Sequence, residues 1–434
     1  MRQLGVFRPA LTIFASGSAL LLPPRSADGQ LTLNAALTAA RRASPELRAA
    51  REAVNAAADR ERQAGAFLNP TLAYSREQTS RAGQTNAQDI AQFEQPLEVG
   101  GQRAARREAA RLRREGAEAR LAATMGQLDF DVARAFAFAV AADQRVRLAE
   151  RTASAFTEAQ RVSEQRLTAG DVSGYSARRL RLEAARFAAV RAGAALERRS
   201  TRTALSTLMG LPTAAGDSLA LPDELPATAT ALAALSLDSL LQRAERERAD
   251  VRAVALDAAV ASAEARLAAR ERIPTPTLSA GYKGERLADP SLGSLTGFRG
   301  IIAGVSIPLP VFDRRASAVA AAESDARRVA AEVDVARRRV GREVTDALDA
   351  LRAAEAQRAA LAPHLGADAR IAVQAVQASY VEGEITLLEW LDAVRAYQDA
   401  ESTYLTLQAE VAIRQAALAR AVGTALFPSD SPDQ

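Results

Sequence analysis

The same long pattern occurs twice in this chain, and that duplication restricts the possible folds more than any other feature of the sequence. The stretches QPLEVGGQR at residues 95–103 and IPLPVFDRR at residues 307–315 each end a strand-like segment and begin a very long helix-forming run. Further matches keep one order along the two halves: Leu31 with Leu235, Pro70 with Pro276, Pro96 with Pro308, and Gly170 with Gly383. Chance matches would not keep that order, so we take the duplication as real.

Each repeat is predicted to hold two short helices, a β-hairpin and a long helical hairpin. In the first repeat, residues 31–210, the β-hairpin spans 70–98 and the helical hairpin spans 101–208. In the second repeat, residues 235–426, they span 276–309 and 314–422, and residues 211–234 are expected to link the repeats. Thr32 and Ser236 are the expected N-caps of the opening helices. The turn-rich segments 80–86 and 288–297 are the expected connections between strands.

The helix-forming runs are far longer than an ordinary globular helix. They cover residues 101–167 and 314–380, and some 65 residues at about 1.5 Å each correspond to roughly 100 Å. Pro363 is expected to interrupt the second run. The returning helix of the second repeat has apolar residues spaced by threes, fours and sevens, which predicts an approximate coiled-coil seam: Leu387, Leu391, Val394, Tyr397, Tyr404, Leu407, Val411, Leu418 and Val422.

The composition favours closely packed helices and excludes several classes of function. The chain is 48% hydrophobic but only 4% aromatic, and alanine, which lets helices approach closely, supplies the largest share of the apolar residues. There is no cysteine and a single histidine, His364, so we expect no disulfide, no metal site and no cofactor. Acidic and basic residues alternate along the helices and the net charge is only +4, so no nucleic-acid partner is expected. We find no catalytic constellation in the sequence and expect no enzyme.

The two ends of the chain have distinct compositions. Arg2 and Arg8 precede an apolar run over residues 10–22, which is followed by two prolines and small polar residues. This run is shorter than the roughly 20 apolar residues of a spanning helix, and the pattern is typical of a secretory signal peptide. We therefore expect residues 1–27 to be a signal peptide and the tail, residues 427–434, to be disordered.

The expected strands have about ten residues each, which is long enough to cross a bilayer when tilted, but one chain supplies too few strands to close a barrel. A small barrel needs about eight strands, and an open edge in lipid leaves backbone groups without partners. We therefore predict a mainly α protein with membrane β-structure in which several chains share one barrel. Three copies, a homotrimer, would supply a 12-stranded β-barrel, within the range known for outer-membrane barrels, and would bring the long helices together as an α-helical tunnel. The predicted junctions between barrel and helix are Pro96, Gly100, Gly101, Pro308 and Asp313, because proline suits a strand end.

Three stretches resemble the TolC family of outer-membrane efflux proteins. They are QPLEVGGQR with the helix after it, IPLPVFDRR, and YVEGEITLLEWLDA at residues 380–393, and the resemblance covers residues 31–426. The GGQR form resembles the outer-membrane components of cation-efflux systems of the cobalt–zinc–cadmium type. The resemblance implies a trimeric duct in the outer membrane of a Gram-negative-type cell, with a large periplasmic part. It also implies two partners, a periplasmic adaptor protein and an inner-membrane pump of the RND type.

The resemblance also implies two sets of site residues. The helical turns would dock the adaptor, at Gly170, Asp171 and Val172 in the first repeat and at Gly383, Glu384 and Ile385 in the second. Family members carry acidic residues just past the second turn that form a carboxylate ring at the pore entrance, and Glu389 and Asp392 match those positions. Such a ring favours cations and repels anions. The alternative for these two residues is a solvated helix face with arginine partners such as Arg395.

Three functions stay open at this point. An exit duct for small molecules or cations and the outer-membrane duct of a type I protein-secretion system share one fold. A structural coiled-coil protein of the envelope would explain the helices but neither the two hairpins nor the duplication. The sequence does not identify the exported substrate, which can be a metal cation, a drug or a protein.

Overall fold

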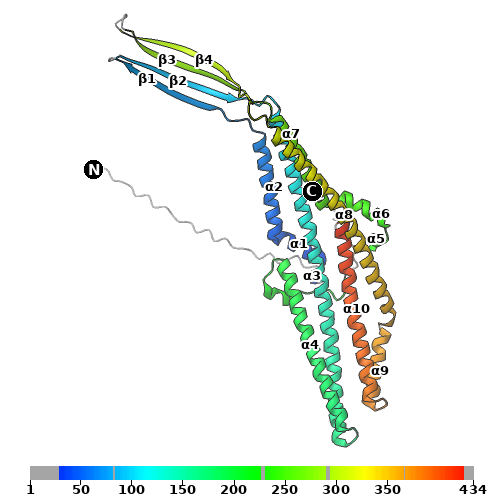
Figure 1. Cartoon of the computed structure of the whole chain (residues 1–434). Helices are drawn as coiled ribbons and strands as arrows, with labels where there is room; N and C mark the ends of the chain where they lie inside the picture. The colour runs from blue at the N-terminus through cyan, green and yellow to red at the C-terminus, as the bar shows by residue number, and fades with distance from the viewer. Residues whose placement is uncertain (1–28, 82–83, 226–229, 290–293, 366, 425–434) are drawn as a thin grey trace, which may run out of the picture.

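The structure, a computed structural model, describes residues 29–81, 84–225, 230–289, 294–365 and 367–424. The molecule is elongated: four strands project from one end of a helical body, and two helical hairpins extend from the other end (Figure 1). The expected signal peptide, residues 1–27, and the expected disordered tail, residues 427–434, lie outside the described residues.

The order of the elements repeats along the chain, as the sequence predicts. The first repeat contains α1 (Leu33–Ala43), α2 (Pro45–Ala64), β1 (Thr71–Arg81), β2 (Gln84–Pro96), α3 (Gln102–Ala169) and α4 (Gly174–Leu208). A 3-10 turn, η1 (Thr213–Ser218), and the short helix α5 (Thr230–Ala233) follow. The second repeat contains α6 (Leu237–Glu247), α7 (Ala249–Arg270), β3 (Thr277–Asp289), β4 (Ser294–Ser306), α8 (Ala316–Leu361), α9 (Ala367–Glu382) and α10 (Leu387–Val422).

Local sequence explains where the helices begin and break. The hydroxyls of Thr32 and Ser236 accept hydrogen bonds from the backbone of α1 and α6, which confirms both predicted N-caps. Pro363 lies in a 3-10 turn, η2 (Ala362–His364), that separates α8 from α9. The predicted interruption is therefore confirmed, because proline lacks the N–H that a continuous helix needs at this point.

The four strands form one antiparallel sheet in the order β1-β2-β3-β4. Two expectations about the hairpins were wrong. The strands extend into the segments expected to be turns, because β1 reaches Arg81 and β2 begins at Gln84. Residues typical of turns can still pair across strands when the register aligns them, as the hydroxyls of Ser80 and Thr85 do at 3.1 Å. At the other end β4 stops at Ser306 rather than at Leu309, since Pro308 cannot donate to the ladder.

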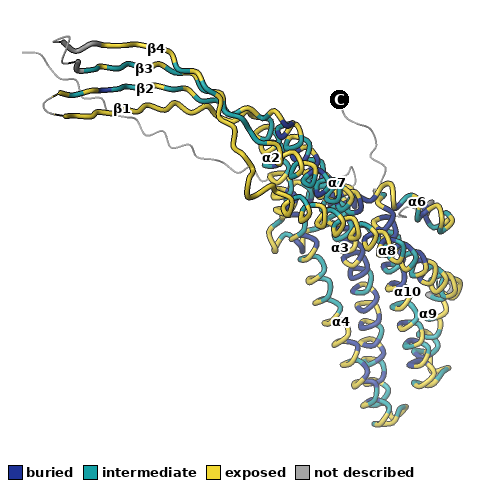
Figure 2. The backbone as a smooth tube through the Cα atoms, turned by 45° about the horizontal axis from the view of Figure 1, so that its top comes forward, coloured by how far each residue is buried: buried dark blue, intermediate teal, exposed yellow. Residues whose placement is uncertain are grey.

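The core lies where the short helices pack on the long ones, and the strands contribute little to it (Figure 2). Buried residues from α1, α3, α6, α8 and α10 form one apolar cluster. Leu221 and Leu232, from the segment between the repeats, are buried in this cluster. Six of the nine predicted seam residues of α10 are buried: Leu391, Val394, Leu407, Val411, Leu418 and Val422.

Candidate functional site

Both helical hairpins turn through the same backbone geometry at the end of the molecule away from the strands (Figure 1). After α3, Gly170 has a φ of 86° and the N–H of Asp171 donates to the carbonyl oxygen of Arg166 at 2.9 Å. After α9, Gly383 has a φ of 89° and the N–H of Glu384 donates to the carbonyl oxygen of Ser379 at 2.8 Å. These are Schellman-type helix ends. The six predicted docking residues thus lie in two matched turns, with Val172 and Ile385 half-buried and the other four exposed.

The two turns are tied together by an arginine that the sequence analysis did not identify. Arg166 of α3 donates hydrogen bonds to the carbonyl oxygens of Tyr380, at 3.3 Å, and Val381 in α9. These carbonyls belong to the last turn of α9 and have few partners within their own helix. The guanidinium therefore satisfies the end of α9 and joins the first helical hairpin to the second.

An aromatic cluster packs between the hairpins just above the turns. Phe156 of α3 stacks on Phe187 of α4 at a ring-centroid distance of 4.3 Å, and Trp390 of α10 lies 4.8 Å from Phe156 and 5.1 Å from Tyr380. Trp390 is fully buried. In a chain with 4% aromatic residues and a single tryptophan, such a gathering is a specific packing feature. The rarity of aromatic residues could have pointed to these four, but the sequence does not show that they meet.

The structure gives Glu389 a local role at the start of α10. Thr386 and Glu389 form a capping box, in which the backbone N–H and the hydroxyl of Thr386 each donate to the Glu389 carboxylate at 2.8 Å. These hydrogen bonds hold the pKa of Glu389 below its ordinary value, and the bond from the backbone N–H contributes most. The equivalent position of the first repeat is Ser176, whose N–H donates to the cap residue Ser173 at 3.2 Å. Glu389 is thus an exposed carboxylate already engaged in capping.

Asp392 stands one turn further along α10 and differs from Glu389. It is exposed, and within the described part of the chain it takes part in no hydrogen bond or ion pair of its side chain. The alternative for the two acids was a solvated helix face with arginine partners such as Arg395. Both acids are exposed, as on a solvated face, but Arg395 pairs with Glu183 of α4 instead of with either of them. That pair is mostly buried, with side-chain exposures of 29% for Arg395 and 11% for Glu183. Of the two predicted entrance residues, Asp392 alone leaves its carboxylate unengaged.

The sheet has one apolar and one polar face next to the helical body. The register places Leu72, Phe93, Ala280 and Ala303 in one row, and Tyr74, Ala91, Tyr282 and Ile301 in the next row of the same face. The side chains of Leu72 and Ile301 are 77% and 88% exposed. The other face is more polar: its rows contain Ser75, Gln92, Ser279 and Lys283, together with the isoleucines Ile90 and Ile302. An exposed apolar face of this extent marks a contact surface for an apolar partner.

The predicted junction residues lie between the strands and the long helices. Pro96 ends β2, and Gly100 packs so closely that an added Cβ would stand 2.8 Å from the Cβ of Ile273. Gly101 precedes the first residue of α3 in a left-handed conformation. On the other side Pro308 follows β4, and the Asp313 carboxylate accepts a hydrogen bond from the N–H of Arg315 at 2.7 Å. Asp313 therefore stabilises the turn before α8, whereas Arg315 is the residue at the cap.

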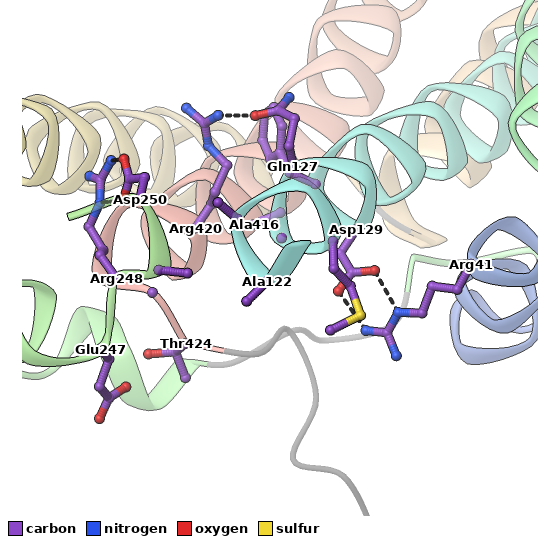
Figure 3. A pocket seen from close by; sticks show the side chains of 16 residues that line it. Arg41, Ala122, Gln127, Asp129, Glu247, Arg248, Asp250, Ala416, Arg420 and Thr424 are labelled. Atoms are coloured by element: carbon purple, nitrogen blue, oxygen red, sulfur yellow. Dashed lines mark hydrogen bonds and ion pairs between the residues drawn. The ribbon is translucent and has the colours of Figure 1, made fainter. Parts of the chain in front are cut away.

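A cavity of about 390 Å³ lies at mid-height, between α1, α3, α7 and α10 (Figure 3). Its charged side chains are largely paired with one another. Arg41 makes two hydrogen bonds to Asp129, at 2.8 and 2.5 Å, and Arg248 pairs with Asp250 at 2.6 Å. These pairs join α1 to α3 and fix the break between α6 and α7. The charges around the cavity thus connect helices, and we assign it no ligand.

Among the helices within the described ranges, none has an apolar stretch long enough to cross a bilayer.

Comparison with known proteins places this architecture in one family. The family model described as outer membrane efflux protein matches residues 36–211 and 240–424. The cobalt-zinc-cadmium resistance protein CzcC of Cupriavidus metallidurans is 30% identical over 387 residues, which cover 88% of this chain and 87% of that protein.

Solved structures of outer-membrane channels have the same fold. The outer-membrane channel OprN matches with a TM-score of 0.74 and 21% identity over 91% of both chains. CusC, whose structures describe transmembrane channel formation, matches with a TM-score of 0.70 and 22% identity over 91% of this chain and 92% of that one.

Proposed function

Because the chain belongs to the outer membrane efflux protein family, we propose that it is the outer-membrane exit duct of a tripartite efflux system. The observation that carries this proposal is the four-stranded sheet, which has an exposed apolar face and two edge strands, β1 and β4. A sheet edge cannot remain open in lipid, because its backbone groups would have no hydrogen-bonding partners. Three copies joined edge to edge supply about 12 strands, within the range of outer-membrane barrels.

Transport through such a duct is passive and needs no bond chemistry. The long helices of three copies form the walls of a periplasmic tunnel below the barrel, and cargo delivered at the tip passes along it. The turns at Gly170 and Gly383 contact a periplasmic adaptor, which joins the duct to an inner-membrane pump of the RND type. The proposed contact with the adaptor is supported by the position of both turns at the end of the molecule opposite the strands.

Entry at the tip is controlled by carboxylates, and Asp392 contributes the main charge. Its side chain is exposed and unengaged within the described residues, whereas the Glu389 carboxylate caps α10. Three Asp392 carboxylates around a narrow mouth favour cations.

The cargo proposed is a divalent metal cation of the cobalt, zinc and cadmium group. The support is the similarity to CzcC, which is named for resistance to these metals. The second candidate is the duct of a type I protein-secretion system, which uses the same fold. Deletion of the gene distinguishes the two: sensitivity to cobalt, zinc or cadmium supports cation efflux, and loss of a secreted protein with unchanged metal tolerance supports secretion.

The first experiment is the native mass of the protein extracted from outer membranes in detergent. A trimer is expected, and a monomer or recovery in the soluble fraction would refute the shared barrel. Single-channel recordings then compare Asp392→Asn with Glu389→Gln. We expect Asp392→Asn to lower the ratio of cation to anion permeability more strongly, because it removes an unengaged charge. A ratio unchanged by Asp392→Asn would refute the carboxylate ring at this position.

A further inference from the structure

We propose that β4 of one copy pairs with β1 of the next copy in the register that β2 and β3 use within a chain, so that Ser306 faces Ala73 of the neighbouring copy. This inference rests on the proposed trimer and adds the residue-by-residue contact that joins its subunits. It follows from the way the two repeats correspond in the sheet.

The two β-hairpins are equivalent in register as well as in sequence. Thr71 and Thr277 are equivalent residues, as are Glu94 and Ser306, because they follow the matches Pro70 with Pro276 and Pro96 with Pro308. In the sheet, Thr71 lies opposite Glu94 in the first hairpin, and Thr277 lies opposite Ser306 in the second. Equivalent residues therefore pair with equivalent residues, and each hairpin is one copy of the same structural unit.

The seam between the two units of a chain shows how one unit joins the next. Glu94 of β2 lies opposite Ser279 of β3, and Pro96 lies opposite Thr277. Just beyond the strand, the N–H of Leu97 donates to the carbonyl oxygen of Pro276 at 2.8 Å. We call this β2–β3 pairing inside a chain the inner seam. A closed ring also needs an outer seam between neighbouring chains, and β4 and β1 are the edge strands available for it.

Applying the repeat equivalence to the inner seam gives the outer one. Ser306 then faces Ala73 of the neighbouring copy, and Pro308 faces its Thr71. The N–H of Leu309 donates to the carbonyl oxygen of its Pro70. The contact is heterologous, since the β4 edge of each copy meets the β1 edge of the next, and such contacts close into a ring.

The stagger of this register fits a closed membrane barrel. Thr71 of β1 lies opposite Glu94 of β2, which lies opposite Ser279 of β3. Ser279 is the equivalent of Ala73 and not of Thr71. The register therefore shifts by two residues along the strand for every two strands crossed. Two residues correspond to about 6.6 Å along the strand and two strands to about 9.6 Å across the sheet, which gives a strand tilt of about 35°. Barrels in membranes tilt by about 35–45°. Repetition of one register around the ring therefore produces a standard tilt.

The side chains at the two seams also compensate one another. In the inner seam Gln92 faces Gly281, where an added Cβ would stand 2.6 Å from the carbonyl oxygen of Ala91. In the outer seam the equivalent residues are Gly304 and Ser75 of the neighbouring copy. Each pair contains one glycine. It lies on β3 in the inner seam, opposite the β2 residue, and on β4 in the outer seam, opposite the β1 residue.

Below the strands, the two edges of the chain carry surfaces that would cover each other. On the β4 side, Val311 is 63% exposed and Phe312 is 102% exposed. On the β1 side, an open groove of about 760 Å³ is lined by Phe67, Leu68, Leu97 and Val99. Phe312 and Phe67 are the equivalents of Gly100 and Ile273, which touch across the inner seam. The outer seam thus brings Phe312 to the groove beside Phe67.

Cysteine cross-linking tests the register, because the natural chain contains no cysteine. A chain carrying Ser306→Cys and Ala73→Cys is extracted from membranes, oxidised, and run without reducing agent. Directly opposed residues have Cβ atoms about 4.5–5.5 Å apart, close to the distance that a disulfide spans. The control carries Ser306→Cys and Leu72→Cys, since a shift of one residue puts the second thiol on the opposite face of the sheet.

The expected result is covalent dimers and trimers for the Ser306–Ala73 variant, at a yield at least tenfold above the Ser306–Leu72 control. Native mass is measured on both variants before oxidation. A trimer that cross-links equally in both, or only in the control, would overturn the proposed register and leave the duct in place. Absence of a trimer would overturn the register and the proposed function together. A second test attaches a nitroxide at Phe312→Cys or at Ile301→Cys and measures its collision rate with lipid-soluble oxygen. Equal collision rates at the two positions would show that Phe312 contacts lipid, and this result would also count against the outer seam.

Discussion

The ion pair between Glu183 and Arg395 gives the most direct test of how the two helical hairpins are held together. Glu183 belongs to α4 and Arg395 to α10, so the pair connects the first hairpin to the second beside the aromatic cluster of Trp390. Replacing Arg395 with methionine keeps the length of the side chain and removes its charge. The Glu183 carboxylate, only 11% exposed, then loses its main partner.

Removing one partner of a buried ion pair costs about 3–5 kcal/mol, because the other charge remains away from water. Two features place Arg395→Met at the low end, about 3 kcal/mol. The arginine side chain is 29% exposed, and Arg186 stays within 3.9 Å of the other oxygen of Glu183. A cost of about 3 kcal/mol raises the population with separated hairpins by roughly a hundredfold.

Hydrogen exchange in detergent measures this population through the backbone amides of α9 and the first turns of α10. We expect much faster exchange there for Arg395→Met. The control is Arg414→Met on the same helix, whose ion pair with Glu410 at 3.0 Å is about 40% exposed on both sides. An exposed pair of this kind contributes no more than about 0.5 kcal/mol.

The double variant Glu183→Gln with Arg395→Met tests the cause. It removes the buried charge as well, so we expect slower exchange than in Arg395→Met alone. Equal exchange in Arg395→Met and Arg414→Met would show that the pair does not hold the hairpins. A double variant as open as the single one would show that the unpaired carboxylate is not the reason.

Two further predictions concern stability. Gly423→Ala and Gly170→Ala both place alanine at a φ above 80°, but an added Cβ at Gly423 would stand 2.8 Å from backbone atoms of Glu247 and Arg248, whereas Gly170 has open space. We expect a clearly larger fall in Tm for Gly423→Ala, and equal falls would contradict this steric reasoning. For Asp250, burial raises the pKa, but the hydrogen bond and charge of Arg248 outweigh burial and hold it below the ordinary value. Ionised Asp250 therefore stabilises the fold above about pH 4, and this stabilisation is lost as pH falls through the lower native pKa. Thermal melts between about pH 5 and 3 should show a smaller loss for Asp250→Asn than for the natural chain, and parallel losses would exclude Asp250 as a source of the pH dependence.

The sequence was sufficient for the features that local chemistry determines. Thr32 and Ser236 directly precede helical segments and cap them, and Pro363 removes a donor from the middle of a helix. The glycines at 170 and 383 occupy the left-handed positions at the helix ends. Each of these predictions depends on a few neighbouring residues. The caps and the glycines could also be compared with a second copy, whereas Pro363 has Glu150 at the equivalent position of the first repeat.

Features that depend on distant contacts could not be predicted in this way. Arg395 is separated from Glu183 by more than two hundred residues, and the sequence offers many nearer acids as partners. The same holds for Arg166, which reaches carbonyl oxygens that no side-chain pattern reveals. The hairpin turns were misplaced for a different reason: polar residues such as Ser80 pair across strands once a long register is in place.

The two repeats have matched turns at the tip but different charges there, and this difference bears on how the tunnel is arranged. At the position equivalent to Glu389 the first repeat has Ser176, and at the position equivalent to Asp392 it has Arg179. If α4 and α10 both faced the axis at the entrance, each Asp392 would stand near an arginine and the mouth would carry little net charge. An entrance that favours cations therefore requires α10 to face the axis and α4 to lie outside it. In that arrangement the proposed carboxylate ring would contain one Asp392 from each copy, three rather than six acids, and its negative charge would come from the second repeat alone.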